Sequence, residues 1–169
     1  MTKYVKKDML AEFPASNMQG TSTTPANDNL FKVNEHSPPL GNQQKESFHT
    51  MVAKGLFVGK RARQEIQTTI AFLCTRVQKP TKEDWNKLCK MMKFIKATQD
   101  DCLILEYNGK KTIEWYVDAA FAVHNDFRSH TGATMTMGGG SITSFSTKQK
   151  LNTRSSTEAE LVAVDDAMS

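Results

Sequence analysis

Three carboxylates near the end of the 169-residue chain have types and spacing that could do chemistry: Asp118, Glu158 and Glu160. Glu158 follows Ser155 by three residues, which is the capping-box pattern at the start of a helix, so it has a structural role. Glu160 lies about 200° around the same helix, in a row with small apolar residues such as Ala163. A carboxylate on a helix face that packs against a sheet is costly unless it is paired or bound to a metal ion.

Asp118 ends the stretch TIEWYVD, in which Ile113, Trp115 and Val117 share one face and Asp118 points to the other. An acid followed by two alanines is well placed for a metal, although Asp is also a common turn former at strand ends. Oxygen ligands of this kind suit Mg²⁺ or Mn²⁺. Two carboxylates on different elements are also the arrangement of two-metal phosphodiester cleavage. Spacing alone leaves both the metal-binding and the structural interpretation open.

The elements that must position these carboxylates follow from hydrophobic periodicity. From Asp101 the apolar residues alternate: CLILEYN and TIEWYVD flank Gly109, and GATMTMG and SITSFST flank Gly138–Gly140. Each pair predicts a β-hairpin, and Ser155 then starts a helix. We expect residues 101–169 to form an α/β domain of four strands and one helix. One helix is too little to cover both faces of the sheet, so we expect a truncated domain.

The first 46 residues divide into two segments. Residues 1–14 predict a short amphipathic helix in which Val5, Met9 and Phe13 lie four residues apart on one face, and Pro14 ends it. Residues 15–46 are rich in Ser, Thr, Asn, Gly and Pro. This composition predicts a flexible, poorly ordered tether with no core of its own.

Residues 47–100 predict a helical connection. An apolar stripe from Ser47 onward contains Phe48, Val52, Leu56 and Phe57. A later helix, Lys82 to about Thr98, stacks four apolar residues: Trp85, Leu88, Met92 and Ile95. Thr81 and Asp84 predict a capping box at its start.

The same region is basic. Residues 51–100 carry eleven Lys/Arg against four Asp/Glu, whereas residues 101–169 carry six against nine. Its candidate nucleic-acid-binding residues are Arg61, Arg63, Lys87, Lys90, Lys93 and Lys96, of which the lysines recur every third residue. A basic block beside an acidic one suits a protein that binds a polyanion in one place and holds carboxylates in another. The alternative is a solvated, lysine-rich helix face.

Other features of the sequence exclude several classes of protein. Cys74, Cys89 and Cys102 are widely spaced and odd in number, so a disulfide framework is not indicated and reduced thiols are expected. The amino-terminal stretch lacks the apolar region of a secretory signal, and no stretch is apolar enough for a membrane span. We therefore expect a cytoplasmic or nuclear protein that is neither secreted nor membrane-bound. The sequence does not indicate its oligomeric state.

Several ordered motifs resemble a known family. WYVDAAFAVHNDFRSHTG, GGGSITSFSTKQK and SSTEAEL resemble the start of the ribonuclease H domain of copia-type retrotransposon polyproteins. YVKKDMLAEFP, FHTMVAKGLFVGKRARQEIQTTIAFLCTRVQKP and LCKMMKFIKAT resemble the segment that joins the reverse transcriptase palm to that domain. The resemblance implies a truncated ribonuclease H-like fold. It also implies two-metal hydrolysis of the RNA strand of an RNA–DNA hybrid, with Asp118 and Glu160 as catalytic, metal-binding residues.

The sequence also departs from this family. The family's third Asp should follow the helix on another strand, and Asp165 and Asp166 lie on the helix and do not replace it. The paired-aspartate motif of the polymerase is absent. We therefore expect weak metal binding and no efficient cleavage. A non-catalytic nucleic-acid-binding module and a degenerate gene product without activity stay open as alternatives. His124 and His130 are expected at the loop surface after Asp118.

Overall fold

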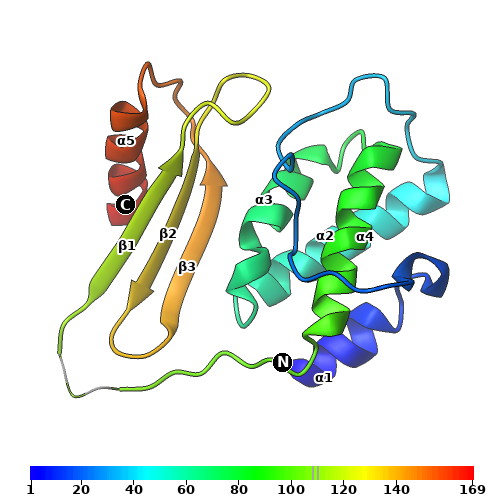
Figure 1. The fold of residues 1–169 in the computed structure, drawn as a ribbon, viewed down its shortest axis with the longest axis horizontal. Helices are drawn as coiled ribbons and strands as arrows, with labels where there is room; N and C mark the ends of the chain where they lie inside the picture. Colours follow the sequence, from blue (N-terminus) through cyan, green and yellow to red (C-terminus); the bar gives the residue numbers. More distant parts are fainter. Residues whose placement is uncertain (108, 110) are drawn as a thin grey trace. The chain divides into compact units, whose positions relative to one another are not determined.

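The computed structural model describes residues 1–107, 109 and 111–169. The chain forms two compact units, Met1–Cys102 and Leu103–Ser169, and each is described by itself (Figure 1). In the described part of the chain no helix is long and apolar enough to cross a membrane. The three cysteines are free thiols: Cys89 is buried, Cys74 is half-buried and Cys102 is exposed.

The first unit is helical. Its amino-terminal helix consists of α1 (Thr2–Tyr4) and a π-helical continuation, Val5–Leu10. Three longer helices follow: α2 (Asn42–Gly59), α3 (Gln67–Arg76) and α4 (Lys82–Ala97). Short 3₁₀ turns lie at Ala15–Met18 and Gln64–Ile66. The predicted amino-terminal face is buried in the common core through Val5, Met9 and Phe13.

Helix α2 begins earlier than the sequence predicted and buries a different stripe. Phe48 and Val52 are buried as expected, but Leu56 and Phe57 are exposed. Gly55 takes their place in the interface, because a Cβ added there would overlap the Cδ1 atom of Ile70. The absence of a side chain at Gly55 therefore lets α2 and α3 approach closely, which a search for apolar residues overlooks.

Helix α4 begins as the sequence predicted. The Thr81 hydroxyl accepts from the Asp84 amide, and the Asp84 carboxylate accepts from the Thr81 amide at 2.9 Å, which completes the capping box. The same carboxylate accepts from Arg76 Nε at 3.2 Å and so ties the end of α3 to the start of α4. All four apolar residues expected to stack along α4 are buried: Trp85, Leu88, Met92 and Ile95.

Residues 15–46 differ from the prediction of a flexible tether without a core. Met18, Leu30 and Leu40 are buried in the core of the first unit. The backbone near Leu40 is also held, because its amide donates to the Pro80 carbonyl at 3.0 Å. The polar composition concealed these well-separated apolar anchors, each of which removes surface from water although the backbone between them is irregular.

The second unit is a mixed α/β unit. Its strands β1 (Glu114–Ala120), β2 (His130–Thr136) and β3 (Ser141–Lys148) form an antiparallel sheet in the order β1-β2-β3. Helix α5 (Ser156–Met168) packs against β1 and β2 (Figure 1). The predicted second hairpin and the helix that follows Ser155 are therefore confirmed.

The first predicted hairpin is wrong in its pairing. The stretch before Gly109 does not pair with β1 in the described residues. Instead, Glu106 exchanges two backbone hydrogen bonds with Gly139 in the turn between β2 and β3, at 2.9 and 2.7 Å. Gly140 has φ +80°, and a Cβ there would overlap the Ile104 carbonyl oxygen. The glycines at 138–140 thus leave room for the backbone of residues 104–106 to pack against the turn. Hydrophobic alternation alone does not predict this contact. Asn108 and Lys110 of the predicted turn lie outside the described residues.

The second unit buries little apolar surface. Among its described residues the buried hydrophobic side chains are all alanines: Ala133, Ala159 and Ala163. Larger side chains, including Trp115, Phe127 and Leu161, are exposed. The well-packed core of the chain therefore belongs to the first unit.

The burial of Leu30 predicts a stability effect that a free tether would not give. Leu30 is 6% exposed, whereas Leu56 on α2 is 39% exposed. We expect Leu30→Ala to lower the free energy of unfolding by about 2–4 kcal/mol, because it leaves a cavity. The control Leu56→Ala should cost less than about 1 kcal/mol. Urea unfolding of the full chain measures both, and equal small effects would contradict the docked position of Leu30.

Candidate functional site

The basic face of α4 consists of Lys87, Lys90, Lys93 and Lys96, and its members differ in how they are engaged. The Lys87 ammonium lies 3.2 Å from the Glu83 carboxylate and 4.7 Å from the centroid of the Phe72 ring. It also donates to the Lys32 carbonyl. The Lys87 charge is therefore largely satisfied inside the first unit.

The charged groups of the next two lysines, Lys90 and Lys93, are available to bind a ligand. Within the described part of the chain, the ammonium groups of Lys90 and Lys93 make no hydrogen bond or ion pair. Both side chains are half-buried, so their aliphatic stems cover apolar surface while the charges reach water. Lys96 is exposed and makes one long contact of 3.4 Å to the Met18 carbonyl. Three cations thus line one side of α4.

The two candidate arginines have different roles in the structure. Arg61 is exposed, and its guanidinium lies 4.2 Å from the centroid of the Phe57 ring. Arg63 is only 3% exposed and donates to the Thr98 carbonyl at 3.0 Å. Arg63 is therefore a structural residue that ties the chain before α3 to the end of α4, and it is not available to bind a ligand.

Asp118 lies on β1, opposite Gly132 of β2. The neighbouring pair is Ala119 with Thr131, and the Thr131 hydroxyl donates to Asp166 of α5 at 2.8 Å. Thr131 therefore points toward α5, and alternation along the strand turns Asp118 to the opposite face. That face is open near Gly132, where an added Cβ would meet nothing within 4 Å. Asp118 is exposed there.

The two glutamates of α5 are separated as the sequence predicted. The Ser155 hydroxyl accepts from the Glu158 amide at 3.2 Å, and the Glu158 carboxylate accepts from the Arg154 amide at 2.6 Å. Glu158 thus satisfies the start of the helix, one residue earlier than in a standard capping box. Glu160 is half-buried and makes no hydrogen bond or ion pair with the described residues.

The positions of Asp118 and Glu160 show whether these two carboxylates could bind one metal ion. Helix α5 carries Glu160 on one side of the sheet, while Asp118 points to the other. In the described ranges 1–107, 109 and 111–169, no three His, Cys, Asp or Glu side chains gather where a metal could bind. Mg²⁺ is commonly held by one or two carboxylates that share it with water and phosphate oxygens, so these two carboxylates would have to lie on the same side of the sheet to hold one ion together.

The prediction of loop-surface histidines is wrong. His124 and His130 are 7% and 5% exposed, and His130 belongs to β2. His124 Nε2 and His130 Nδ1 are hydrogen-bonded at 3.0 Å, and His130 Nε2 is hydrogen-bonded to Ser146 Oγ at 2.7 Å. The loop folds back because the His124 amide donates to the Arg128 carbonyl. This polar network could not be predicted from the sequence, in which only the alternation around His130 points to a strand.

Burial lowers the pKa of both histidines. The pKa of His130 falls to about 4, first because of burial and then because of repulsion from His124. The pKa of His124 is lowered by burial and by the charge of Lys148, and Asp126 partly offsets this. The two imidazoles are therefore neutral near pH 7 and share their hydrogen bond in that form.

Comparison with known proteins shows what the chain is related to. It is 28% identical, in an alignment that covers 97% of its length, to a retrovirus-related Pol polyprotein from transposon TNT 1-94 of Nicotiana tabacum. It is 30% identical over 60% of its length to an uncharacterised mitochondrial protein of Arabidopsis thaliana. It is also 30% identical over 63% of its length to a retrovirus-related Pol polyprotein from transposon RE2 of the same plant.

These relatives confirm the predicted resemblance to a retrotransposon polyprotein. The chain spans 12%, 43% and 7% of their respective lengths, so it corresponds to a part of each. No family model matches the chain, and no solved structure matches it.

The buried histidines predict a loss of stability in acid. His130 has a pKa near 6.5 when unfolded and about 4 when folded, so the unfolded state binds a proton first as the pH falls. The stability from this group is complete above pH 6.5, and about 2 kcal/mol of it should be lost between pH 7 and pH 5. Urea unfolding, followed through the amide signals of β2 at both pH values, measures the loss.

A matched variant identifies the group responsible. His130→Gln should remove most of the pH dependence, whereas the exposed His49→Gln should retain it. A pH dependence that survives in His130→Gln would assign the effect to other groups.

Proposed function

We propose that this chain is a nucleic-acid-binding segment of a retrotransposon Pol polyprotein, and that it binds the phosphate backbone of an RNA–DNA hybrid through α4. The observation that carries this proposal is the row of lysines on α4, whose Lys90 and Lys93 ammonium groups make no internal ion pair among the described residues. The similarity to a Pol polyprotein over 97% of the chain supports it.

The charge distribution favours binding through phosphates. Residues 51–100 carry a net charge of +7. When lysines on one helix face neutralise the phosphates of a nucleic acid, the counterions condensed on those phosphates are released, which favours binding. We assign Lys90, Lys93 and Lys96 to this surface, and the exposed Arg61, which follows α2, is a separate candidate cation. Lys87 and Arg63 are excluded, because their charged groups are bound within the first unit. Such contacts position a nucleic acid without reading its sequence.

A second proposal concerns the fold and chemistry of the second unit. We propose that it is part of a ribonuclease H-like domain, because Asp118 and Glu160 match that family's motifs and an antiparallel sheet is followed by a helix. Hydrolysis of the RNA strand with Mg²⁺ is the chemistry that this resemblance implies. Helix α5, which carries Glu160, covers the face of the sheet opposite to the one that Asp118 faces, so we propose that this chain binds the hybrid but does not cleave it alone.

Salt dependence tests the binding surface. For the full chain on a hybrid duplex, the logarithm of the affinity should fall linearly with the logarithm of the salt concentration, with roughly −0.9 added to the slope for each phosphate contact. The double variant Lys93→Gln with Lys96→Gln should weaken binding and make the slope shallower by about 2. Fluorescence anisotropy across salt concentrations measures both quantities.

The control replaces a lysine on another helix. Lys45→Gln, at an exposed position of α2, should leave the slope unchanged. A flat salt response of the wild type, or a double variant that binds like the wild type, would reject the surface on α4.

A further inference from the structure

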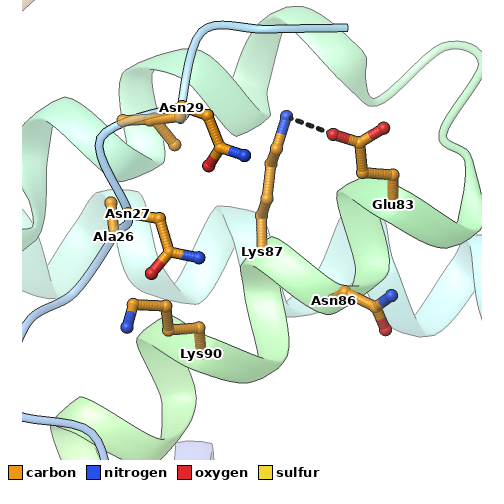
Figure 2. A pocket seen from close by; sticks show the side chains of 8 residues that line it. Ala26, Asn27, Asn29, Glu83, Asn86, Lys87 and Lys90 are labelled. Carbon is orange, nitrogen blue, oxygen red and sulfur yellow. Dashed lines mark ion pairs between the residues drawn. The ribbon is translucent and has the colours of Figure 1, made fainter. Parts of the chain in front are cut away.

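A cavity of about 140 Å³ lies between the irregular segment 26–30 and helix α4. Figure 2 shows Asn27 and Asn29 projecting from this segment toward Lys87 and Lys90 of α4. The lining residues are Ala26, Asn27, Asn29, Leu30, Glu83, Asn86, Lys87 and Lys90. One wall comes from the segment expected to be a tether, so the cavity could not be predicted from the sequence.

The walls of the cavity are held in place by contacts outside it. Leu30 is buried in the core and fixes the segment that carries Asn27 and Asn29. On the opposite wall, Lys87 is paired with Glu83 (Figure 2). Lys87 also donates to the Lys32 carbonyl, and its side chain is only 12% exposed. The backbone of the segment and the Lys87–Glu83 pair are therefore held in place before any ligand binds, which lowers the entropy cost of binding.

The lining has a definite chemistry. Three asparagine amides, from Asn27, Asn29 and Asn86, offer both donors and acceptors, as a planar base edge requires. The charges of Lys87 and Glu83 balance each other, which leaves the Lys90 ammonium as the uncompensated charge among the lining residues. A fitting ligand combines a planar polar ring with one anionic group.

The volume selects a ligand of one ring. At ~30 Å³ for each water in the liquid, 140 Å³ corresponds to about five waters, which is room for one nucleobase but not for a base pair. In a duplex the pairing edges are occupied, whereas unpaired bases offer them to side chains. Asparagine forms paired hydrogen bonds with base edges, and lysine binds phosphate.

We infer that this cavity binds one unpaired nucleotide of a single-stranded nucleic acid, with the base edge on the asparagine amides and the phosphate on Lys90. This inference rests on the proposed nucleic-acid function and adds a site that distinguishes single strands from duplexes. The lysine face of α4 would hold the neighbouring phosphates, since Lys93 lies three residues beyond Lys90 on the same helix.

The test compares three probes on the full chain by NMR: cytidine monophosphate, whose base has a single ring, inorganic phosphate and an eight-nucleotide single strand. The side-chain amide signals of Asn27, Asn29 and Asn86 should shift with the nucleotide and with the single strand. Inorganic phosphate should shift them far less at equal concentration. Equal shifts with phosphate alone would show that no base is recognised and would overturn the inference.

Substitutions distinguish binding in the cavity from binding to the basic face of α4. The double variant Asn27→Ala with Asn29→Ala should weaken single-strand binding about fivefold and leave hybrid-duplex binding unchanged. Both residues are exposed, so the fold should be retained. The control Asn42→Ala, exposed at the start of α2, should change neither.

The outcomes keep the two proposals distinct. Hybrid binding that persists while the double asparagine variant binds single strands like the wild type would overturn only the nucleotide site. A complete loss of binding to every nucleic acid in the wild type would overturn the proposed function and the nucleotide site together.

Discussion

The buried carboxylate of Asp84 is the contact on which the functional part of the molecule depends. It accepts from the Thr81 amide and hydroxyl and from Arg76 Nε at 2.9, 3.0 and 3.2 Å. These bonds begin α4, orient it against α3 and keep a buried charge paired, which an isolated carboxylate would not tolerate. The start of α4 is also bonded to the Pro38 carbonyl through the Lys82 amide. The lysine face and the cavity both lie on the helix that this carboxylate positions.

The packing of α4 explains how one helix serves two purposes. Its apolar residues enter the core, so the lysines three residues apart must lie along the remaining face. Near the helix start, Lys87 turns to Glu83 and the segment that crosses it, and this closes one wall of the cavity. Farther along, Lys93 is half-buried and Lys96 is exposed, and their charged groups suit a polyanion. The second unit contrasts with this arrangement, because its sheet is covered on one face and buries only alanines among its described apolar side chains.

The sequence predicted the features that depend on local chemistry. The capping box at Thr81, the buried face of α4, the second hairpin and the separate position of Glu158 all follow from short-range patterns. It did not predict features that depend on long-range packing. The docking of Leu30 depends on a distant core, and the pairing of Glu106 with Gly139 depends on a turn that accepts a passing backbone. The burial of His130 likewise depends on a partner from a loop. The side of the sheet that Asp118 faces was inferred from alternation, but the position of the helix relative to it required the structure.

The proposal that this chain binds a hybrid without cutting it depends on the position of α5, which carries Glu160 and covers the face of the sheet opposite to the one that Asp118 faces. The most direct measurement incubates the full chain with a labelled RNA–DNA hybrid in Mg²⁺ and separately in Mn²⁺, and follows both binding and the length of the RNA strand. We expect a retarded complex with the RNA strand intact in either metal. Cleavage of the RNA strand by the wild type that disappears in Glu160→Gln would contradict the proposal, because the two carboxylates would then form a working metal site within this chain.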